Sequence, residues 1–502
     1  MKHIDLLFQE HAGKISEDYL ADMGLDHIKN ILEPELCASF LNVISSPLKC
    51  REKISERQNI LKDFLEHPGL ALTIRKICVE IQQNKCTSTH NDKRDRLKDF
   101  KTVLERSMNI SGELLKHLQH RQFSSEALKE LRNQLNRAVQ IDSIHHRITE
   151  LINASVSNNY TLGIEYGSGF KFRGANVYSN KTNKNNNGGK NDGANGTSNI
   201  FKLIKNNLKS TSTIQKEPSG FYYPSNYIIE AEIVEIMDKV PMYTGMIITD
   251  LNRHILNFCS TLAKQLNFYI ACIEIIKYLD SSNINSVFPE VPNENSKNAD
   301  GIHAEELLDF GLIINEKEHI VANDFSDSGG AYYLISGENQ GGKTTFLKSL
   351  GIAQLFAQSG MKVSAAQYIC PVFNNFFSHF PKDEDEDLNY GKLAEELTRI
   401  RQSSQLISDN SLALFNESFA TTTEIEGYEI ACDILRAFSH TNAKIFFVTH
   451  NLPLLKKRGE LSLSNGVEIK SLVVNGRTYK IIEGEPRERL DTIDFLERFK
   501  FA

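Results

Sequence analysis

The sequence predicts a multidomain protein: a helical region interrupted by an irregular insert, followed by an α/β domain in residues 300–502. Three observations predict this fold class. Apolar side chains recur at helical spacing in residues 1–155, a stretch rich in Asn, Gly and Lys lies mid-chain, and short apolar runs alternate with helical segments after residue 330. Strands that alternate with helices indicate a largely parallel sheet.

The composition is that of an ordinary globular protein. The chain has 502 residues, of which 40% are apolar and 24% charged. No apolar run approaches the roughly 20 residues that span a bilayer, and the first residues lack the apolar stretch of a signal peptide. The eight cysteines are scattered without metal-binding spacing, so we expect reduced thiols and a cytoplasmic location. The net charge of -7 argues against a wholly basic nucleic-acid binder but leaves room for a local basic patch.

Residues 1–155 are expected to form a helical core that ends in one long amphipathic helix. Apolar residues recur at spacings of three and four from residue 128 to residue 151. Ser124 or Ser125 is placed to cap the start of this helix, with Glu126 in its first turn. The pattern is compatible with a helical bundle and with a projecting lever.

The insert occupies residues 156–245. Residues 160–177 contain strand-like stretches punctuated by glycine, and residues 179–199 form a low-complexity loop that we expect to be disordered. Helical periodicity returns from about Met246 to Leu279. Residues 246–299 are therefore assigned to a returning helix, core helices and a polar connector.

The elements of the C-terminal domain follow from short apolar runs. Strands are predicted at residues 331–336, 412–415 and 445–448, helices at 346–358 and 428–438, and a hairpin at 472–483 around Asn475 and Gly476. On the second helix, Ile430, Ile434 and Phe438 are predicted to share the apolar face.

Residues 337–344, GENQGGKT, match the phosphate-binding pattern GxxxxGK[ST] between a predicted strand and a predicted helix. Its glycines let backbone N–H groups converge on phosphate oxygens, and the helix N-terminus adds positive potential. Lys343 is predicted to reach the terminal phosphates of ATP, and Thr344 to bind Mg²⁺. The predicted ATP contacts in this loop are Gly337, Asn339, Gly341, Gly342, Lys343, Thr344 and Thr345. An ordinary glycine turn is the alternative.

A second buried strand ends in Asn416 and Glu417, the form of a Walker B element. Glu417 is predicted to orient or deprotonate the attacking water. Asn416 stands where an Asp normally contacts the magnesium shell, and it contributes no charge. His450, at the end of a third strand, is a candidate sensor of the γ-phosphate. A strand-end turn and a structural histidine are the alternatives.

These residues resemble the MutS family of DNA-repair ATPases. GENQGGKTT is similar to the family's GPNMGGKST, residues 321–324 to its VPND stretch, residues 360–365 to its GxxVPA segment, residues 417–427 to its DEIGRGTSTxDG segment, and Thr449-His450 to its ATH. The five matches occur in the same order. The resemblance of residues 321–324 implies that Val321 lies beside the nucleotide. The family often carries an aromatic near the position of the preceding Ile320, which is aliphatic here.

The resemblance implies an ABC-like P-loop ATPase domain and a helical core with two lever helices, between which a DNA-contacting clamp is inserted. It further implies that ATP binding and hydrolysis are coupled to clamp movement in DNA mismatch repair or recombination. Pairing of two chains, or of the chain with a homologue, is also implied.

The sequence departs from the family pattern in three places. Residues 387–392 match only the start of the trans-acting signature DLAxGxSTF. The N-terminal mismatch-reading domain is absent, and the chain stops soon after Pro486. We therefore expect a short member that does not read mismatched bases.

The insert supplies the candidate DNA contacts, because residues 171–216 contain nine basic residues against one acidic residue. The residues chosen are Lys171, Arg173, Lys202, Lys205 and Lys209. A solvated Asn/Lys-rich loop is the alternative.

Two other functions compete with a DNA-binding ATPase. A transporter-type ATPase subunit would carry an LSGGQ signature, which the sequence lacks. A non-catalytic or weakly catalytic scaffold that binds ATP is favoured by Asn416 and opposed by Glu417.

Overall fold

The computed structural model describes residues 5–83, 109–140, 160–166, 172–179, 226–293, 300–315, 319–327, 331–381, 392–404, 410–419, 422–441, 443–461 and 463–486. The chain divides into two compact units. The first comprises Met1–Asn84, Gly112–Asn136 and Leu256–Ala502, and the second comprises Lys85–Ser111 and Arg137–Ile255.

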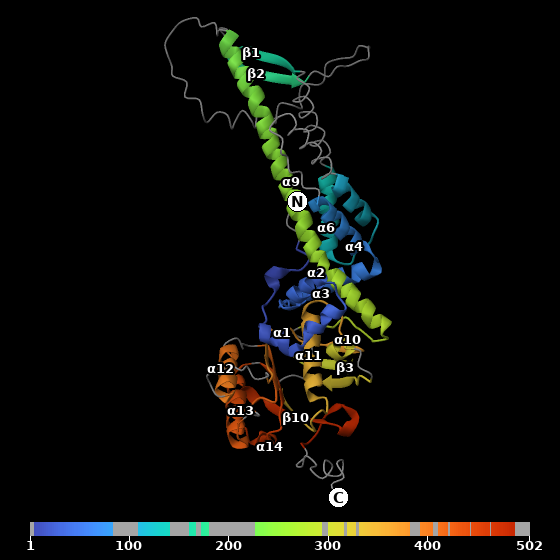
Figure 1. The fold of residues 1–502 in the computed structure, drawn as a ribbon, viewed down its shortest axis with the longest axis vertical. Helices are drawn as coiled ribbons and strands as arrows, with labels where there is room; N and C mark the ends of the chain where they lie inside the picture. The colour runs from blue at the N-terminus through green and yellow to red at the C-terminus, as the bar shows by residue number, and fades with distance from the viewer. Residues whose placement is uncertain are drawn as a thin grey trace, which may run out of the picture. The chain divides into compact units, whose positions relative to one another are not determined.

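The N-terminal part of the first unit is helical, as predicted (Figure 1). Its α-helices include α1 (Glu17–Met23), α2 (Pro34–Ile44), α3 (Arg51–Glu66), α4 (Leu70–Gln83) and α6 (Glu126–Gln140), and its 3₁₀ helices include η1 (Gln9–His11) and η2 (Leu25–Asn30). α2 begins with Pro34, whose fixed φ suits the first turn and whose missing N–H costs no helical bond there.

Helix α3 joins the helical part to the C-terminal part of the same unit through Arg57. This side chain is buried, donates to the carbonyl oxygens of Leu7 and Ser359, and lies over the Phe268 ring at 5.7 Å. Ser359 follows directly on the helix that begins at Lys343. Burial lowers the pKa of Arg57 to about 10, so it remains a cation near neutral pH.

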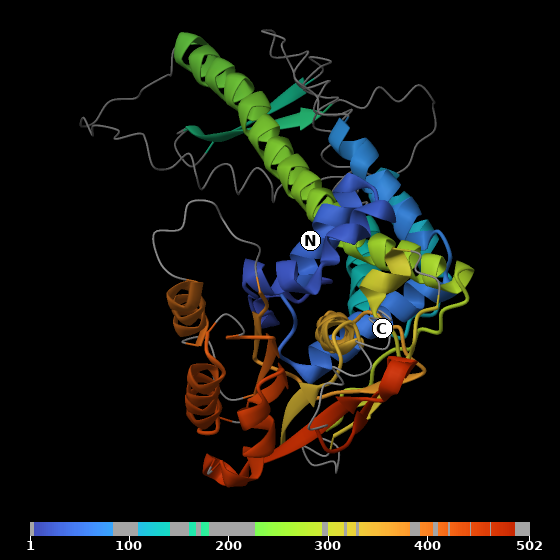
Figure 2. The same cartoon turned by 60° about the horizontal axis from the view of Figure 1, so that its bottom comes forward.

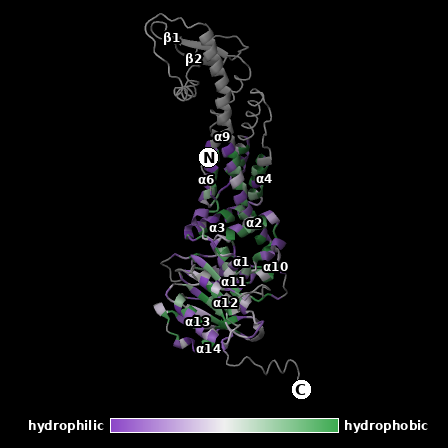
Figure 3. Ribbon diagram, turned by 60° about the vertical axis from the view of Figure 1, so that its left-hand side comes forward, coloured by the Kyte–Doolittle hydropathy of each residue, from purple (hydrophilic) through white to green (hydrophobic). Residues whose placement is uncertain are grey.

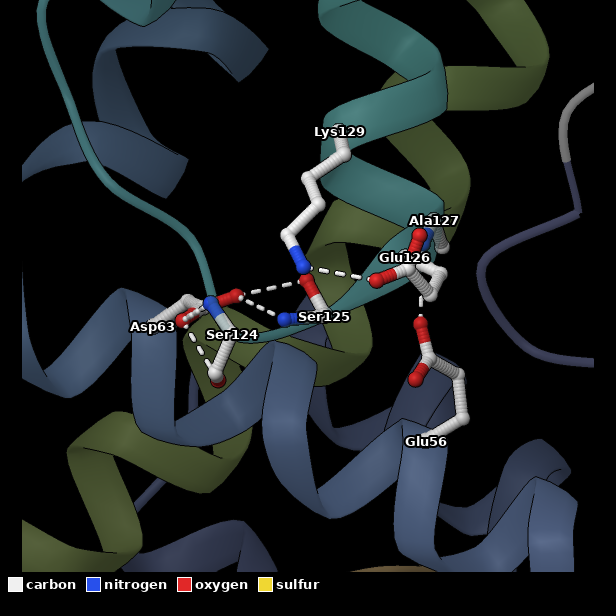
Figure 4. A network of polar contacts seen from close by, with 7 residues as sticks. All are labelled: Glu56, Asp63, Ser124, Ser125, Glu126, Ala127 and Lys129. Atoms are coloured by element: carbon white, nitrogen blue, oxygen red, sulfur yellow. Dashed lines mark hydrogen bonds and ion pairs between the residues drawn. The ribbon is translucent and has the colours of Figure 1, made fainter.

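The start of α6 is held by two carboxylates of α3 (Figure 4). The Asp63 oxygens accept from the backbone N–H groups of Ser124 and Ser125 at 2.7 and 2.9 Å and from their hydroxyls at 2.8 and 2.5 Å. Glu56 accepts from the N–H of Ala127 at 2.8 Å. The prediction of a local serine cap gave the right starting residue for α6, but both hydroxyls donate to Asp63. The acceptors come from another helix, which sequence periodicity does not reveal.

The second unit contains an antiparallel pair of strands, β1 (Tyr160–Tyr166) and β2 (Phe172–Ser179), with an irregularity between Glu165 and Tyr166. This pair matches the strand-like stretches predicted there. The predicted loop 179–199 lies almost wholly outside the described residues, as does the part of the predicted long helix beyond residue 140.

Helix α9 (Asn226–Ser281) is 56 residues long and belongs to both units. The predicted start near Met246 was wrong, because the helix begins at Asn226 and already includes Pro241 and Gly245. These two residues usually weaken or break a helix, so the sequence before Met246 did not have the pattern of one.

A six-stranded sheet forms the centre of the C-terminal part, in the order β11-β10-β5-β9-β8-β7. Its strands are β5 (Ala331–Ser336), β7 (Asn375–His379), β8 (Ser411–Asn416), β9 (Lys444–Val448), β10 (Glu468–Val474) and β11 (Ile481–Glu483). All neighbouring pairs are parallel except β10–β11, which confirms the prediction of a largely parallel sheet.

Helices cover both faces of this sheet (Figure 2). One face packs against α12 (Lys392–Ser404), α13 (Glu424–Phe438) and α14 (Leu452–Lys456), and the other against α11 (Lys343–Gln358). Every residue of β8 and β9 is buried, which explains their continuous apolar runs. Figure 3 shows hydrophobic residues in green among the strands and helices of this part of the chain.

The apolar face of α13 differs in part from its prediction. Its buried residues include Ala431, Cys432, Leu435 and Phe438, whereas Ile430 and Ile434 are only partly buried at the edge of the cluster. The small side chains of Ala431 and Cys432 allow close approach to the sheet, and spacing among large apolar residues alone did not identify them.

A second, three-stranded sheet has the order β4-β3-β6, with β3 (His303–Leu307), β4 (Asn323–Ser326) and β6 (Gln367–Ile369). α10 (Phe310–Ile314) follows β3, and the 3₁₀ helices η3 (Arg458–Glu460) and η4 (Ser464–Gly466) precede β10. The hairpin β10–β11 is confirmed, with η5 (Gly476–Thr478) in its loop.

All seven cysteines in the described residues are free thiols, five of them buried. Within the same residues, no helix combines the length and apolarity needed to cross a bilayer.

Candidate functional site

The phosphate-binding loop connects the central strand β5 to helix α11, as predicted. Gly337 has φ 145° and Gly342 has φ 93°, values that side chains rarely adopt. A Cβ at Gly337 would lie 2.6 Å from Val474 Cγ2, so the neighbouring strand β10 also excludes a larger residue. Within the loop, Asn339 is exposed and Gly341 half-buried, and Thr345 is half-buried in the first turn of α11.

Lys343 is the first residue of α11 and is only 4% exposed. Its Nζ donates to the carbonyl oxygens of Gly337 at 3.1 Å and Glu338 at 2.8 Å. Burial lowers the pKa of Lys343, while the carboxylates of Glu417 and Glu338 raise it. The ammonium group is thus held against the backbone of the loop.

Thr344 and Asn416 meet although they are far apart in the sequence. Thr344 Oγ1 donates to Asn416 Oδ1 at 2.9 Å, which joins the first turn of α11 to the end of β8. Two uncharged oxygens side by side suit Mg²⁺, which prefers oxygen ligands and keeps several waters or phosphate oxygens of its own. Among the described residues, no cluster of three His, Cys, Asp or Glu offers an all-protein metal site.

Glu417 follows β8 directly, with φ 50° and a backbone N–H that donates to Val448 O at 2.9 Å. Its Oε1 lies 3.4 Å from Nε2 of His450, and both side chains are partly exposed. Burial lowers the pKa of His450, the Lys343 cation lowers it further, and Glu417 opposes both effects. His450 is therefore neutral at pH 7 and can act as a hydrogen-bond donor or acceptor.

Sequence reasoning missed one residue beside the loop, Tyr479. Its side chain is 53% exposed, and it lies close enough to Gly342 that a Cβ there would meet its Cβ and Cδ1 at 3.6 and 3.7 Å. Asn323 holds this segment, because its amide donates to Tyr479 O at 3.3 Å and accepts from Ile481 N–H at 2.7 Å. The half-buried Val321 lies two residues before Asn323. Nothing in the local pattern marked Tyr479, since its neighbour Gly342 is distant in the chain.

The predicted DNA contacts Lys171, Lys202, Lys205 and Lys209 lie outside the described residues, and Arg173 lies on β2. The signature-like segment 387–392 is described only at its last residue, Lys392, where α12 begins.

Comparison with protein families supports the resemblance over both parts of the chain. The family MutS domain V matches residues 333–482, and the family MutS2 N-terminal domain matches residues 50–282. The chain belongs to the MutS family. The domain V match runs from β5 to β11 and so contains the residues described above around the loop 337–345, except Val321 and Asn323.

Curated relatives carry the name endonuclease MutS2. The chain is 33% identical to that of Bacillus velezensis over 178 residues, which are 34% of this chain and 22% of the relative. It is 32% identical to that of Streptococcus agalactiae over 220 residues, which are 42% of this chain and 26% of the relative. The matched segments thus span about a quarter of the length of these relatives.

Proposed function

We propose that this MutS-family chain binds ATP with Mg²⁺ and hydrolyses it at the loop 337–345. The proposal rests on side chains that lie together at the carboxyl ends of β5, β8 and β9. These are Lys343, the hydrogen-bonded pair of Thr344 and Asn416, and the pair of Glu417 and His450. Ligands of open parallel sheets bind at that edge. A loop that matched the motif by chance would not gather these partners from three strands.

We propose that different residues of the site bind the phosphates and the Mg²⁺ ion of ATP. Lys343 exchanges its two loop carbonyls for the terminal phosphate oxygens, and the N–H groups at the start of α11 complete the cradle. Thr344 and Asn416 would hold Mg²⁺, which neutralises charge on the phosphates when bound. Because Asn416 is neutral, we expect weaker Mg²⁺ binding than an aspartate would give.

The adenine end of the nucleotide is proposed to lie between Tyr479 and Val321. Tyr479 offers an exposed ring beside Gly342, where the loop passes into α11. An aromatic face stacks well on a base. Ile320 gives no such face, so the tyrosine of the hairpin supplies what that position lacks.

Hydrolysis is assigned to Glu417 and His450. Glu417 would accept a proton from the attacking water or orient it. Its electrostatic interaction with the Lys343 cation supports a role near the terminal phosphate. We propose that neutral His450, whose Nε2 lies 3.4 Å from Glu417 Oε1, responds to the presence of the γ-phosphate.

We extend the proposal to DNA. The nine basic residues in 171–216, including Lys171, Arg173, Lys202, Lys205 and Lys209, would contact the phosphate backbone, with ATP driving clamp movement in mismatch repair or recombination. Family membership supports this reading, and we further propose that two chains pair through ATPase domains of the ABC-like type.

A weakly catalytic ATP-binding scaffold is the second candidate, because Asn416 removes a charge from the magnesium site. Turnover measured with and without duplex DNA separates the two. An ATPase stimulated by DNA supports the first function, and stoichiometric ATP binding without turnover supports the second.

The proposed DNA binding is tested with two proteins. One is the intact chain, and the other lacks residues 179–199 and has Lys202, Lys205 and Lys209 neutralised. Affinity of the intact chain should fall steeply with salt, because each neutralised phosphate releases counterions. Equal affinity in both proteins would remove the insert from DNA binding. Strong preference for a mismatched duplex would contradict backbone recognition.

A further inference from the structure

The segment that carries Glu417 has an unusual backbone. Glu417 has φ 50° and Phe419 has φ 64°, so two residues with side chains adopt the left-handed conformation on either side of Ser418. Such conformations cost free energy and persist only where surrounding contacts impose them. The turn is therefore imposed by its neighbours.

Three contacts hold the turn. The Glu417 N–H donates to Val448 O at 2.9 Å, and the Phe419 side chain is buried in the cluster between the sheet and α13. The third contact is made by His379, the last residue of β7 and the register partner of Phe415 on β8.

His379 holds the turn in two ways. Its Nδ1 is 2.7 Å from Ser418 Oγ, and its ring stacks on Phe419 with centroids 6.1 Å apart and planes 16° apart. His379 is 1% exposed and Ser418 is 8% exposed, so water does not compete for this hydrogen bond. One buried imidazole thus fixes both residues that follow Glu417.

We propose that His379 is a positioning residue for ATP hydrolysis, which holds the Glu417 carboxylate in place through Ser418 and Phe419. The proposal rests on the function proposed above. His379 lies behind the turn and acts on no nucleotide atom. Because Lys343 and Thr344 belong to α11 and do not depend on this turn, loss of His379 should change the rate of hydrolysis and leave ATP binding intact.

Four variants separate positioning from general stability. His379→Leu and Ser418→Ala each remove the hydrogen bond, and His379→Asn keeps a nitrogen close to the position of Nδ1. Ser378→Ala is the matched control: Ser378 is the neighbouring residue of β7 and donates a buried hydrogen bond to Asp22 at 2.6 Å. The control removes a similar bond from the same strand without touching the turn.

The expected result is a split between kcat and affinity. His379→Leu and Ser418→Ala should lower kcat about tenfold or more, because small displacements of a catalytic group are costly. The Kd of a fluorescent ATP analogue should stay within about twofold. A double variant that combines His379→Leu with Ser418→Ala should be no slower than His379→Leu alone, because both changes remove the same hydrogen bond. His379→Asn should recover most of the rate, and Ser378→Ala should keep it.

Hydrogen exchange of the nucleotide-free chain gives a readout independent of activity. Amides in 410–419 should exchange faster in His379→Leu and Ser418→Ala than in Ser378→Ala. The inference is overturned if these variants keep the exchange and kcat of the control. If Glu417→Gln itself leaves turnover unchanged, the proposed role of Glu417 in hydrolysis is refuted. In that case the hydrogen-exchange experiment still decides whether His379 fixes the turn.

Discussion

Replacing Asp63 by Asn should loosen the start of α6 by an amount that the structure allows us to work out. Asp63 is 1% exposed and accepts two backbone and two hydroxyl hydrogen bonds. An asparagine keeps one oxygen, so in either orientation its NH₂ group faces one backbone N–H of Ser124 or Ser125. Rotation of a hydroxyl can relieve one clash, but a backbone donor cannot rotate.

The expected cost is about 3 kcal/mol. A hydrogen bond to a charged group contributes roughly 1.5–3 kcal/mol, and a buried donor left without an acceptor costs roughly 1–3 kcal/mol. The lost negative charge at the helix N-terminus adds a smaller term of the same sign. Three kcal/mol corresponds to about a hundredfold in the local opening equilibrium.

Hydrogen exchange of residues 126–136 measures this opening without assuming that the whole chain unfolds in one step. Glu126→Gln is the control, because the exposed pair of Glu126 with Lys129 contributes under about 1 kcal/mol. Exchange in Asp63→Asn that is no faster than in Glu126→Gln would refute the argument that α3 holds α6.

Three further predictions concern the nucleotide site. Lys343→Ala should abolish ATP binding or hydrolysis, and unchanged turnover in a folded protein would end the assignment of the loop. Asn416→Asp keeps an acceptor for Thr344 and adds a charge, so half-maximal turnover should need several-fold less Mg²⁺; an unchanged Mg²⁺ titration would exclude a role for this position in the metal site. Because the pKa of His450 is lowered in the folded chain, its neutral form stabilises the fold above about pH 6.5, and this contribution is lost as the pH falls through the folded pKa. Turnover should therefore show no inflection from His450 above about pH 7, and an inflection there that disappears in His450→Asn would contradict the neutral assignment.

The parts of the site that the sequence predicted are those encoded by local patterns. The loop 337–344, the strand ending at Asn416 and the strand before His450 each combine an apolar run with polar residues at its end, and a parallel sheet necessarily brings such ends together. The strands predicted at 331–336, 412–415 and 445–448 accordingly agree with β5, β8 and β9 to within one residue, whereas β10 begins at Glu468, before the predicted start of the hairpin at residue 472.

The parts that were missed depend on contacts between distant segments. Tyr479 reaches Gly342 only because the β10–β11 hairpin lies beside β5, and Asp63 caps α6 only because α3 packs against it. The hydrogen bond between His379 and Ser418 likewise needs β7 and β8 to be neighbours. No window of sequence contains both partners of any of these pairs.

Turnover by the Glu417→Gln variant decides whether Glu417 drives ATP hydrolysis at this site. The amide keeps the size of the side chain but cannot accept a proton from the attacking water. ATP should bind to this variant with wild-type affinity, since Lys343 and Thr344 are untouched. If Glu417 activates the attacking water, the wild-type chain hydrolyses ATP with Mg²⁺ and Glu417→Gln does so roughly 10²–10⁴-fold more slowly. Hydrolysis at the wild-type rate in Glu417→Gln would contradict this role.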